Sequence, residues 1–192
     1  MSIKDNIEAI QKKIQAACLR SGRDPSSVRL LAASKRTDAA GIIESIQIGH
    51  RLFGENRAQA LRDKHNIVSE QYPEAEWHFI GYLQKNKVKY IVGRASMIHS
   101  VDSMELAETI SKRIDALRSQ GKEIADIQIL VQVKLGNEEN KTGCPKEQVL
   151  DLCAEIQNLP NLRLAGLMCI PPLYGEAKDW FHQMAELAQK GR

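Results

Sequence analysis

Short apolar segments alternate along the whole chain with longer segments whose apolar residues recur every three or four positions. A short, continuous apolar run is typical of a strand that is buried on both faces, and the longer spacing is typical of a helix with one apolar face. The pattern therefore predicts six strands, at residues 30–35, 52–56, 77–81, 97–101, 127–133 and 162–170.

Residues that can cap a helix lie at the start of several of the longer segments. Ser2 precedes apolar positions that continue to Cys18, Thr37 or Asp38 precedes the next such segment, and Asp102 directly follows the fourth predicted strand. Because Ser, Thr and Asp side chains accept hydrogen bonds from the free N–H groups of a first helical turn, we expect helices to begin after these residues. Further helices are expected from about residues 58, 84, 145 and 176.

The regular alternation of strand and helix is typical of consecutive βαβ units, whose strands form a parallel α/β sheet. An open doubly wound sheet and a closed (β/α) barrel both satisfy it. No Gly-x-Gly-x-x-Gly or Walker motif follows the first strand, so the barrel is favoured over a nucleotide-binding sheet. A TIM-type barrel has eight strands and roughly 200 residues or more. Six strands in 192 residues therefore predict either an open sheet or an incomplete barrel.

Composition narrows the class of protein further. The chain of 192 residues is long enough for one domain with a sizeable core, and its net charge of +3 is too small to indicate a nucleic-acid or membrane partner. No apolar run has the length of a membrane helix, and the first residues lack the apolar core of a secretion signal. The cysteines show no Cys-x-x-Cys or zinc-binding spacing, which favours a reducing, cytoplasmic setting and no metal; they are Cys18, Cys144, Cys153 and Cys169.

A lysine, Lys35, closes the first predicted strand. Strand alternation puts it on the same side as Leu31 and Ala33, and parallel strands of a barrel bring their carboxyl ends to one mouth. If that side faces inward, the small apolar neighbours would partly desolvate the amine and favour its neutral form, which can add to an aldehyde and form a Schiff base. At this point an ordinary strand-end lysine and a carbonyl-binding lysine both remain open.

Several motifs occur in an order that points to one family. They are LAASK at 31–35, FGEN at 53–56, WHFIG at 77–81 with LQ at 83–84 and NK at 86–87, HSVD at 99–102, Glu138 with KTG at 141–143, and GLMCIP at 166–171. Together these motifs resemble the YggS/PROSC family of pyridoxal phosphate (PLP) homeostasis proteins, over about residues 5–190.

The resemblance implies the fold of the alanine racemase N-terminal barrel and a PLP cofactor. It makes Lys35 the Schiff-base lysine and places Asn56 and Met168 beside the cofactor ring, with His78 and Ser100 lining the same mouth. It also implies a regulatory role in intracellular PLP homeostasis without established catalytic turnover. We expect a cytoplasmic monomer that contacts PLP-dependent apoenzymes transiently and binds neither nucleic acid nor membrane.

Each of these residues also has a structural interpretation. His78 can be a hydrogen-bonded core histidine, Met168 a core-filling side chain, Asn56 a turn-stabilising residue and Asp102 a helix cap. Glu138 and Lys141 can form an exposed ion pair in a loop. The basic segment 85–89 can be a solvated helix face or a phosphate-binding or nucleic-acid-binding patch.

The chain departs from the family pattern in two ways. Lys134 stands where the family usually has asparagine, and the chain ends before the last two strands of the family's barrel, which carry most of the phosphate-binding residues. We therefore expect residues 1–192 to form a single PLP-binding barrel domain that lacks two strands and binds PLP weakly. The alternatives are a PLP-dependent amino-acid racemase or related enzyme, and a PLP-free interaction module that acts through segment 85–89.

Overall fold

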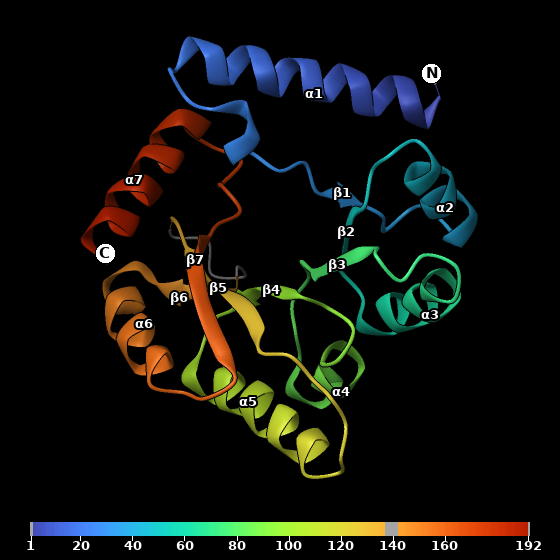
Figure 1. Ribbon diagram of the computed structural model, residues 1–192. Coiled ribbons are helices and arrows are strands. Elements are labelled where there is room, and N and C mark those ends of the chain that lie inside the picture. The colour runs from blue at the N-terminus through green and yellow to red at the C-terminus, as the bar shows by residue number, and fades with distance from the viewer. Residues whose placement is uncertain (1, 137–141, 192) are drawn as a thin grey trace.

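The chain forms a curved, all-parallel sheet with helices arranged around its outer side (Figure 1). The structure is a computed structural model that describes residues 2–136 and 142–191. The sheet has the order β1-β2-β3-β4-β5-β7, and β6 pairs with the end of β5. The strands are β1 (Ala32–Ala33), β2 (Leu52–Glu55), β3 (Glu76–Phe79), β4 (Met97–Val101), β5 (Ile127–Lys134), β6 (Cys144–Pro145) and β7 (Leu162–Met168).

The prediction of six strands in a parallel α/β sheet is confirmed, with the two-residue β6 in addition. Within the described ranges β1 pairs only with β2, and β7 has no partner besides β5, so this sheet does not close. The strand predicted at 30–35 is shorter than expected, because only Ala32 and Ala33 find partners, in Phe53 and Gly54.

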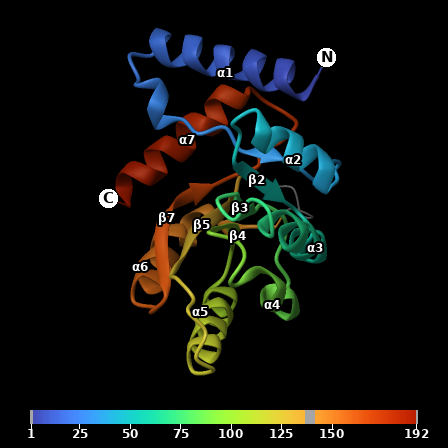
Figure 2. The same cartoon turned by 45° about the vertical axis from the view of Figure 1, so that its right-hand side comes forward.

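The helices are α1 (Ile3–Arg20), α2 (Ala39–Gln47), α3 (Ala58–Ser69), α4 (Val88–Ile91), α5 (Met104–Arg118), α6 (Val149–Gln157) and α7 (Ala177–Lys190). Helix α1 crosses the side of the molecule between α7 and α2 (Figures 1 and 2). Short 3₁₀ helices occupy Pro25–Ser27, Lys85–Lys87 and Lys146–Gln148. In the part of the chain that the structure covers, no helix has the length and apolarity needed to cross a bilayer.

Local capping explains where these helices begin. Ser2 and Asp5 exchange side-chain-to-backbone hydrogen bonds at the start of α1, and Asp38 caps α2. The expectation that Asp102 caps the helix after β4 is wrong. Ser103 is the cap of α5, and its hydroxyl accepts a hydrogen bond from Leu106 N–H, because Asp102 lies one residue too early and its carboxyl group accepts from Gly143 N–H instead.

The core lies between the outer face of the sheet and the helices. Phe53, Trp77 and Phe79 point outward from β2 and β3 and are at most 1% exposed, and the ring of His65 on α3 packs against Trp77. Because side chains alternate along a strand, the residues between them, including His78, face the inner side of the sheet. The inner side therefore carries polar groups, and the outer side provides the apolar burial that stabilises the fold.

Candidate functional site

The carboxyl ends of the strands lie along one edge of the sheet, and two of the predicted site residues are neighbours there. Lys35 follows β1 in a turn, and Asn56 directly follows β2. Ala33 pairs with Gly54, and Ser34 N–H donates to the Gly54 oxygen at 2.9 Å, so the chain leaves both strands side by side. Both Lys35 and Asn56 are exposed.

The partial burial expected for Lys35 is not found. Lys35 and Ala33 are both exposed, whereas Leu31, on the same side of the strand, lies where a side chain on Gly54 would be. The shared side of Leu31 and Ala33 was therefore predicted correctly, but β1 ends at Ala33 at the edge of the sheet, and Lys35 lies exposed in the turn that follows. Lys35 has no hydrogen bond or ion pair to any described residue, so its amine is accessible to a small molecule.

Gly81, just after β3, allows the backbone there to lie very close to the backbone of Asn56. A Cβ at Gly81 would lie 2.1 Å from the main-chain oxygen of Asn56 and 2.6 Å from its Cα. Real Cβ atoms do not come so close to backbone, so any larger residue would push the ends of β2 and β3 apart. The glycine thus keeps the backbone around Asn56 compact.

Ser100 and Met168 lie farther along the same sheet. Ser100 in β4 is 1% exposed, and its Oγ has no hydrogen-bond partner among the described residues. A bulge between Ile98 and Val101 separates it from the regular pairing of β4 with β5. Met168 is the last residue of β7, is half-buried and pairs with Gln132 of β5. Both residues thus lie on the carboxyl-terminal segments of their strands.

His78 is deeper in the sheet than the mouth. It is buried, and it lies level with Gly54 of β2 and Met97 of β4. Its Nε2 is 3.0 Å from Glu76 Oε1, and its Nδ1 is 2.9 Å from His99 Nε2. The interpretation of His78 as a hydrogen-bonded interior histidine is therefore the one that these contacts support.

Burial shifts the titration of this histidine pair. It lowers the pKa of His78 and lowers the pKa of His99 to about 4, and in His99 the neighbouring His78 adds to the effect. Both imidazoles are therefore neutral at pH 7. The hydrogen bond of His99 to His78 was not predicted from the sequence, because in the HSVD motif at 99–102 only Ser100 was considered as a site residue.

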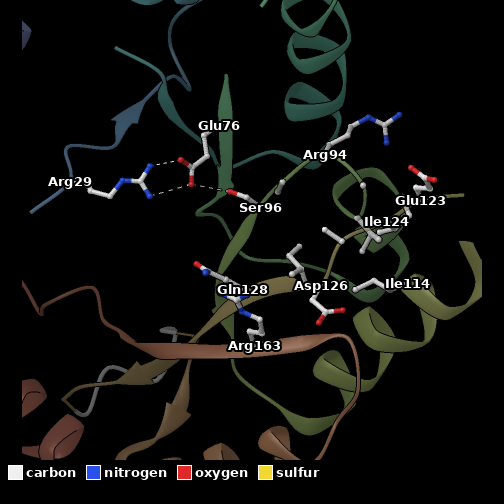
Figure 3. A pocket seen from close by; sticks show the side chains of 15 residues that line it. Arg29, Glu76, Arg94, Ser96, Ile114, Glu123, Ile124, Asp126, Gln128 and Arg163 are labelled. Carbon is white, nitrogen blue, oxygen red and sulfur yellow. Dashed lines mark hydrogen bonds and ion pairs between the residues drawn. The ribbon is translucent and has the colours of Figure 1, made fainter. Parts of the chain in front are cut away.

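The opposite, amino-terminal edge of the sheet holds a cavity of about 440 Å³ (Figure 3). Arg29 and Glu76 form an ion pair there, and Ser96 Oγ donates to Glu76 Oε1 at 3.2 Å. The Arg29 guanidinium holds the pKa of Glu76 at about 2. Because these groups satisfy one another and lie at the far end of the strands from Lys35, we assign this cavity a structural role.

Two charged residues near Lys35 were not singled out from the sequence. Glu55 is fully buried at the end of β2, and Lys64 on α3 contacts it at 2.5 Å. The available signal was a carboxylate inside an apolar strand, since such a group is rarely buried without a partner. Lys64 could not be identified as that partner until the helix was placed.

Other predicted features have different outcomes. Glu138 and Lys141 lie outside the described residues, so the loop ion pair stays a prediction. Lys134 ends β5 and is half-buried. In the basic segment, Lys85 pairs with Glu105, and Lys89 lies over the ring of Tyr90; other basic side chains over that ring are Arg62 and Lys87.

The residues at the carboxyl edge can be tested against the chemistry of PLP. The Lys35 amine, free of described partners, suits an aldehyde, and the buried Ser100 hydroxyl without a partner suits a ligand with hydrogen-bonding groups. Asn56, which directly follows the neighbouring strand β2, adds an exposed amide at the same edge of the sheet. The donor set therefore fits a small aldehyde of this kind.

Comparison with known proteins agrees with this geometry. Residues 2–190 match the family model described as alanine racemase, N-terminal domain. The pyridoxal phosphate homeostasis protein of Vibrio cholerae is 38% identical over 98% of this chain and 80% of its own length. The protein of the same name from Aquifex aeolicus is 36% identical over 97% of this chain and 80% of its own.

Solved structures show the same relationship. A protein from Bifidobacterium adolescentis superimposes with a TM-score of 0.86 at 31% identity, over 95% of this chain and 76% of that one. PipY of Synechococcus elongatus, solved with PLP bound, gives a TM-score of 0.73 at 32% identity, over 94% of this chain and 83% of PipY. Alanine racemase of Clostridium difficile, 14% identical with a TM-score of 0.61, shares the fold. The chain belongs to the alanine racemase N-terminal domain family and, within it, to the YggS/PROSC family of pyridoxal phosphate homeostasis proteins.

Proposed function

We propose that this chain binds PLP at the carboxyl edge of the sheet, with Lys35 Nζ as the group that captures it. PLP supplies an aldehyde, and its condensation with a neutral lysine amine forms a carbon–nitrogen double bond with loss of water. The observation that carries the proposal is the accessible Lys35 amine beside Asn56, in a relative of PLP homeostasis proteins.

The other predicted residues have graded roles in this proposal. Asn56 and Met168 would flank the ring, and Ser100 would supply its free hydroxyl. His78 lies deeper in the sheet and would support the site without bonding PLP, since its two nitrogens already bond Glu76 and His99. In this view residues 1–192 act as one PLP-binding domain.

We further propose a role in PLP homeostasis without turnover of a substrate. A racemase needs acid and base groups on both faces of the bound substrate. The two histidines in the described strands, His78 and His99, are bonded to each other within the sheet, which favours binding over catalysis. The proposed setting is a cytoplasmic monomer that passes PLP to apoenzymes by transient contact.

A titration with PLP tests the proposal. The purified chain is expected to develop the visible absorbance of protein-bound PLP, and Lys35→Ala is expected to abolish it. Lys89→Ala, another exposed lysine, is the matched control and should behave like the wild type. Absorbance that persists in Lys35→Ala would show that another lysine captures PLP.

A second assay separates binding from catalysis. The PLP-loaded chain is incubated with single enantiomers of amino acids, and the appearance of the other enantiomer is followed. We expect no conversion above that of free PLP. Racemisation that depends on Lys35 would support the enzyme alternative.

A further inference from the structure

A buried group of charges holds the backbone directly before Lys35. Glu55 is fully buried, and its Oε1 accepts hydrogen bonds from Lys64 Nζ at 2.5 Å and from Ser34 Oγ at 2.8 Å. Lys64 Nζ also donates to the main-chain oxygen of Ser34 at 2.8 Å. We call Ser34, Glu55 and Lys64 the clamp.

Every polar atom of Ser34 is engaged in or beside the clamp. Its N–H donates to the Gly54 oxygen at 2.9 Å, its hydroxyl donates to Glu55, and its oxygen accepts from both Lys64 and Thr37 N–H. Lys35 follows at once and has an exposed side chain. The backbone at the base of Lys35 is therefore fixed on all sides, whereas its amine stays free.

The clamp compensates for a weak feature of the sheet. Strand β1 has only two residues and one strand partner within the described ranges, so ladder hydrogen bonds alone hold its end loosely. A buried ion pair of this type contributes little net stability, since desolvation of both charges offsets their attraction. Such a pair can still fix geometry, because each partner accepts only a narrow range of positions.

We infer that Glu55 and Lys64 are positioning residues that hold the end of β1 so that Lys35 Nζ meets the aldehyde of PLP. The inference rests on the proposed function of Lys35. Lys64 reaches across from α3 on the outer side of the sheet, and Lys35 follows Ser34 in the turn after β1. The clamp thus acts on Lys35 through the backbone of Ser34 and without contact with the ligand.

The test compares Lys64→Met with Arg118→Met, a matched control. Arg118 also sits on a helix and also bonds one main-chain oxygen, that of Ile124, and one carboxylate, that of Asp126, far from the carboxyl edge. We expect the dissociation constant for PLP to rise about tenfold in Lys64→Met, as for loss of a charged hydrogen bond. In Arg118→Met it should stay within about twofold.

Hydrogen exchange of the PLP-free chain provides an independent measurement. Lys64→Met should speed exchange at the amides of Ser34 and Thr37 and leave that of Gln128, bonded to the Ser96 oxygen, unchanged. Lys64→Arg keeps a charged donor and should restore much of the affinity. Should Lys64→Met not fold, Glu55→Gln serves instead, since its amide oxygen still accepts both hydrogen bonds while the charge is lost.

The outcomes are distinct. Wild-type PLP affinity in Lys64→Met, or an equal loss in Arg118→Met, overturns the inference. So does unchanged exchange at Ser34 and Thr37, and this result needs no PLP. If the wild-type chain takes up no PLP while exchange changes as expected, the proposed function fails and the clamp is shown to be structural only.

Discussion

His99 Nε2 lies 2.9 Å from His78 Nδ1, and this contact joins the two histidines in a hydrogen-bonded network through the sheet. His78 Nε2 faces the carboxylate of Glu76, so we assign the proton of His78 to Nε2. Its Nδ1 is then an acceptor, and His99 donates to it from Nε2. Arg29 completes the network by pairing with Glu76.

This hydrogen-bonded network predicts that the stability of the fold decreases in acid. Burial lowers the pKa of His99 from 6.5 to about 4, so between these values the unfolded state binds a proton that the folded state does not. Stability should therefore fall as the pH drops from 6.5 toward 4, by at most about 1.4 kcal/mol per pH unit for one such group. The lowered pKa of His78 acts in the same direction. Urea unfolding at a series of pH values measures the slope.

His99→Gln isolates the contribution of one imidazole. Glutamine keeps a donor near the position of Nε2 but does not titrate, so the slope between pH 6.5 and 4 should decrease. His182→Gln is the control, because His182 is exposed on α7. A slope in His99→Gln equal to that of the wild type would contradict the assignment. The pKa of Glu76 is lowered from 4.5 to about 2, so protonation of its carboxylate lowers stability further between these pH values, in the wild type and in His99→Gln alike.

Gly81→Ala tests the close approach of the ends of β2 and β3. The new methyl group would meet the Asn56 backbone at 2.1 Å, and the backbone would have to move. We expect a loss of about 1–3 kcal/mol in the free energy of unfolding, as for overpacking in a tight core. Gly191→Ala is the control, since the atom nearest to a Cβ there is the end of the flexible Leu150 side chain, at 3.3 Å. Similar stability of the two variants would show that Gly81 is not constrained.

Ser100→Ala separates ligand binding from stability. The buried hydroxyl has no partner among the described residues, so its removal leaves no hydrogen bond broken and relieves a desolvation cost of about 1 kcal/mol or more. The PLP-free chain should be as stable as the wild type or more so. Affinity for PLP should fall if the hydroxyl serves the ligand. Chemical denaturation and PLP titration check both expectations, and a destabilised variant with unchanged affinity would contradict them.

The sequence allowed the strands, most caps and the shared side of Leu31 and Ala33 to be predicted because these depend on local periodicity and capping chemistry. The exposure of Lys35 could not be predicted, since it depends on what covers the inner side of β1. The pairing of His78 with His99 depends on the register of β3 against β4 and on the bulge in β4. The contact of Lys64 with Glu55 depends on how α3 packs on β2, which no local pattern encodes.

The most direct test of the central claim locates the lysine that captures PLP. The PLP-loaded chain is treated with borohydride, which adds hydride to the carbon–nitrogen double bond and leaves a stable amine. The product is cleaved with a protease that does not cut at lysine and analysed by mass spectrometry. The account predicts the added phosphopyridoxyl mass on Lys35. Its appearance on a different lysine, such as Lys134, with Lys35 unmodified, would contradict the account.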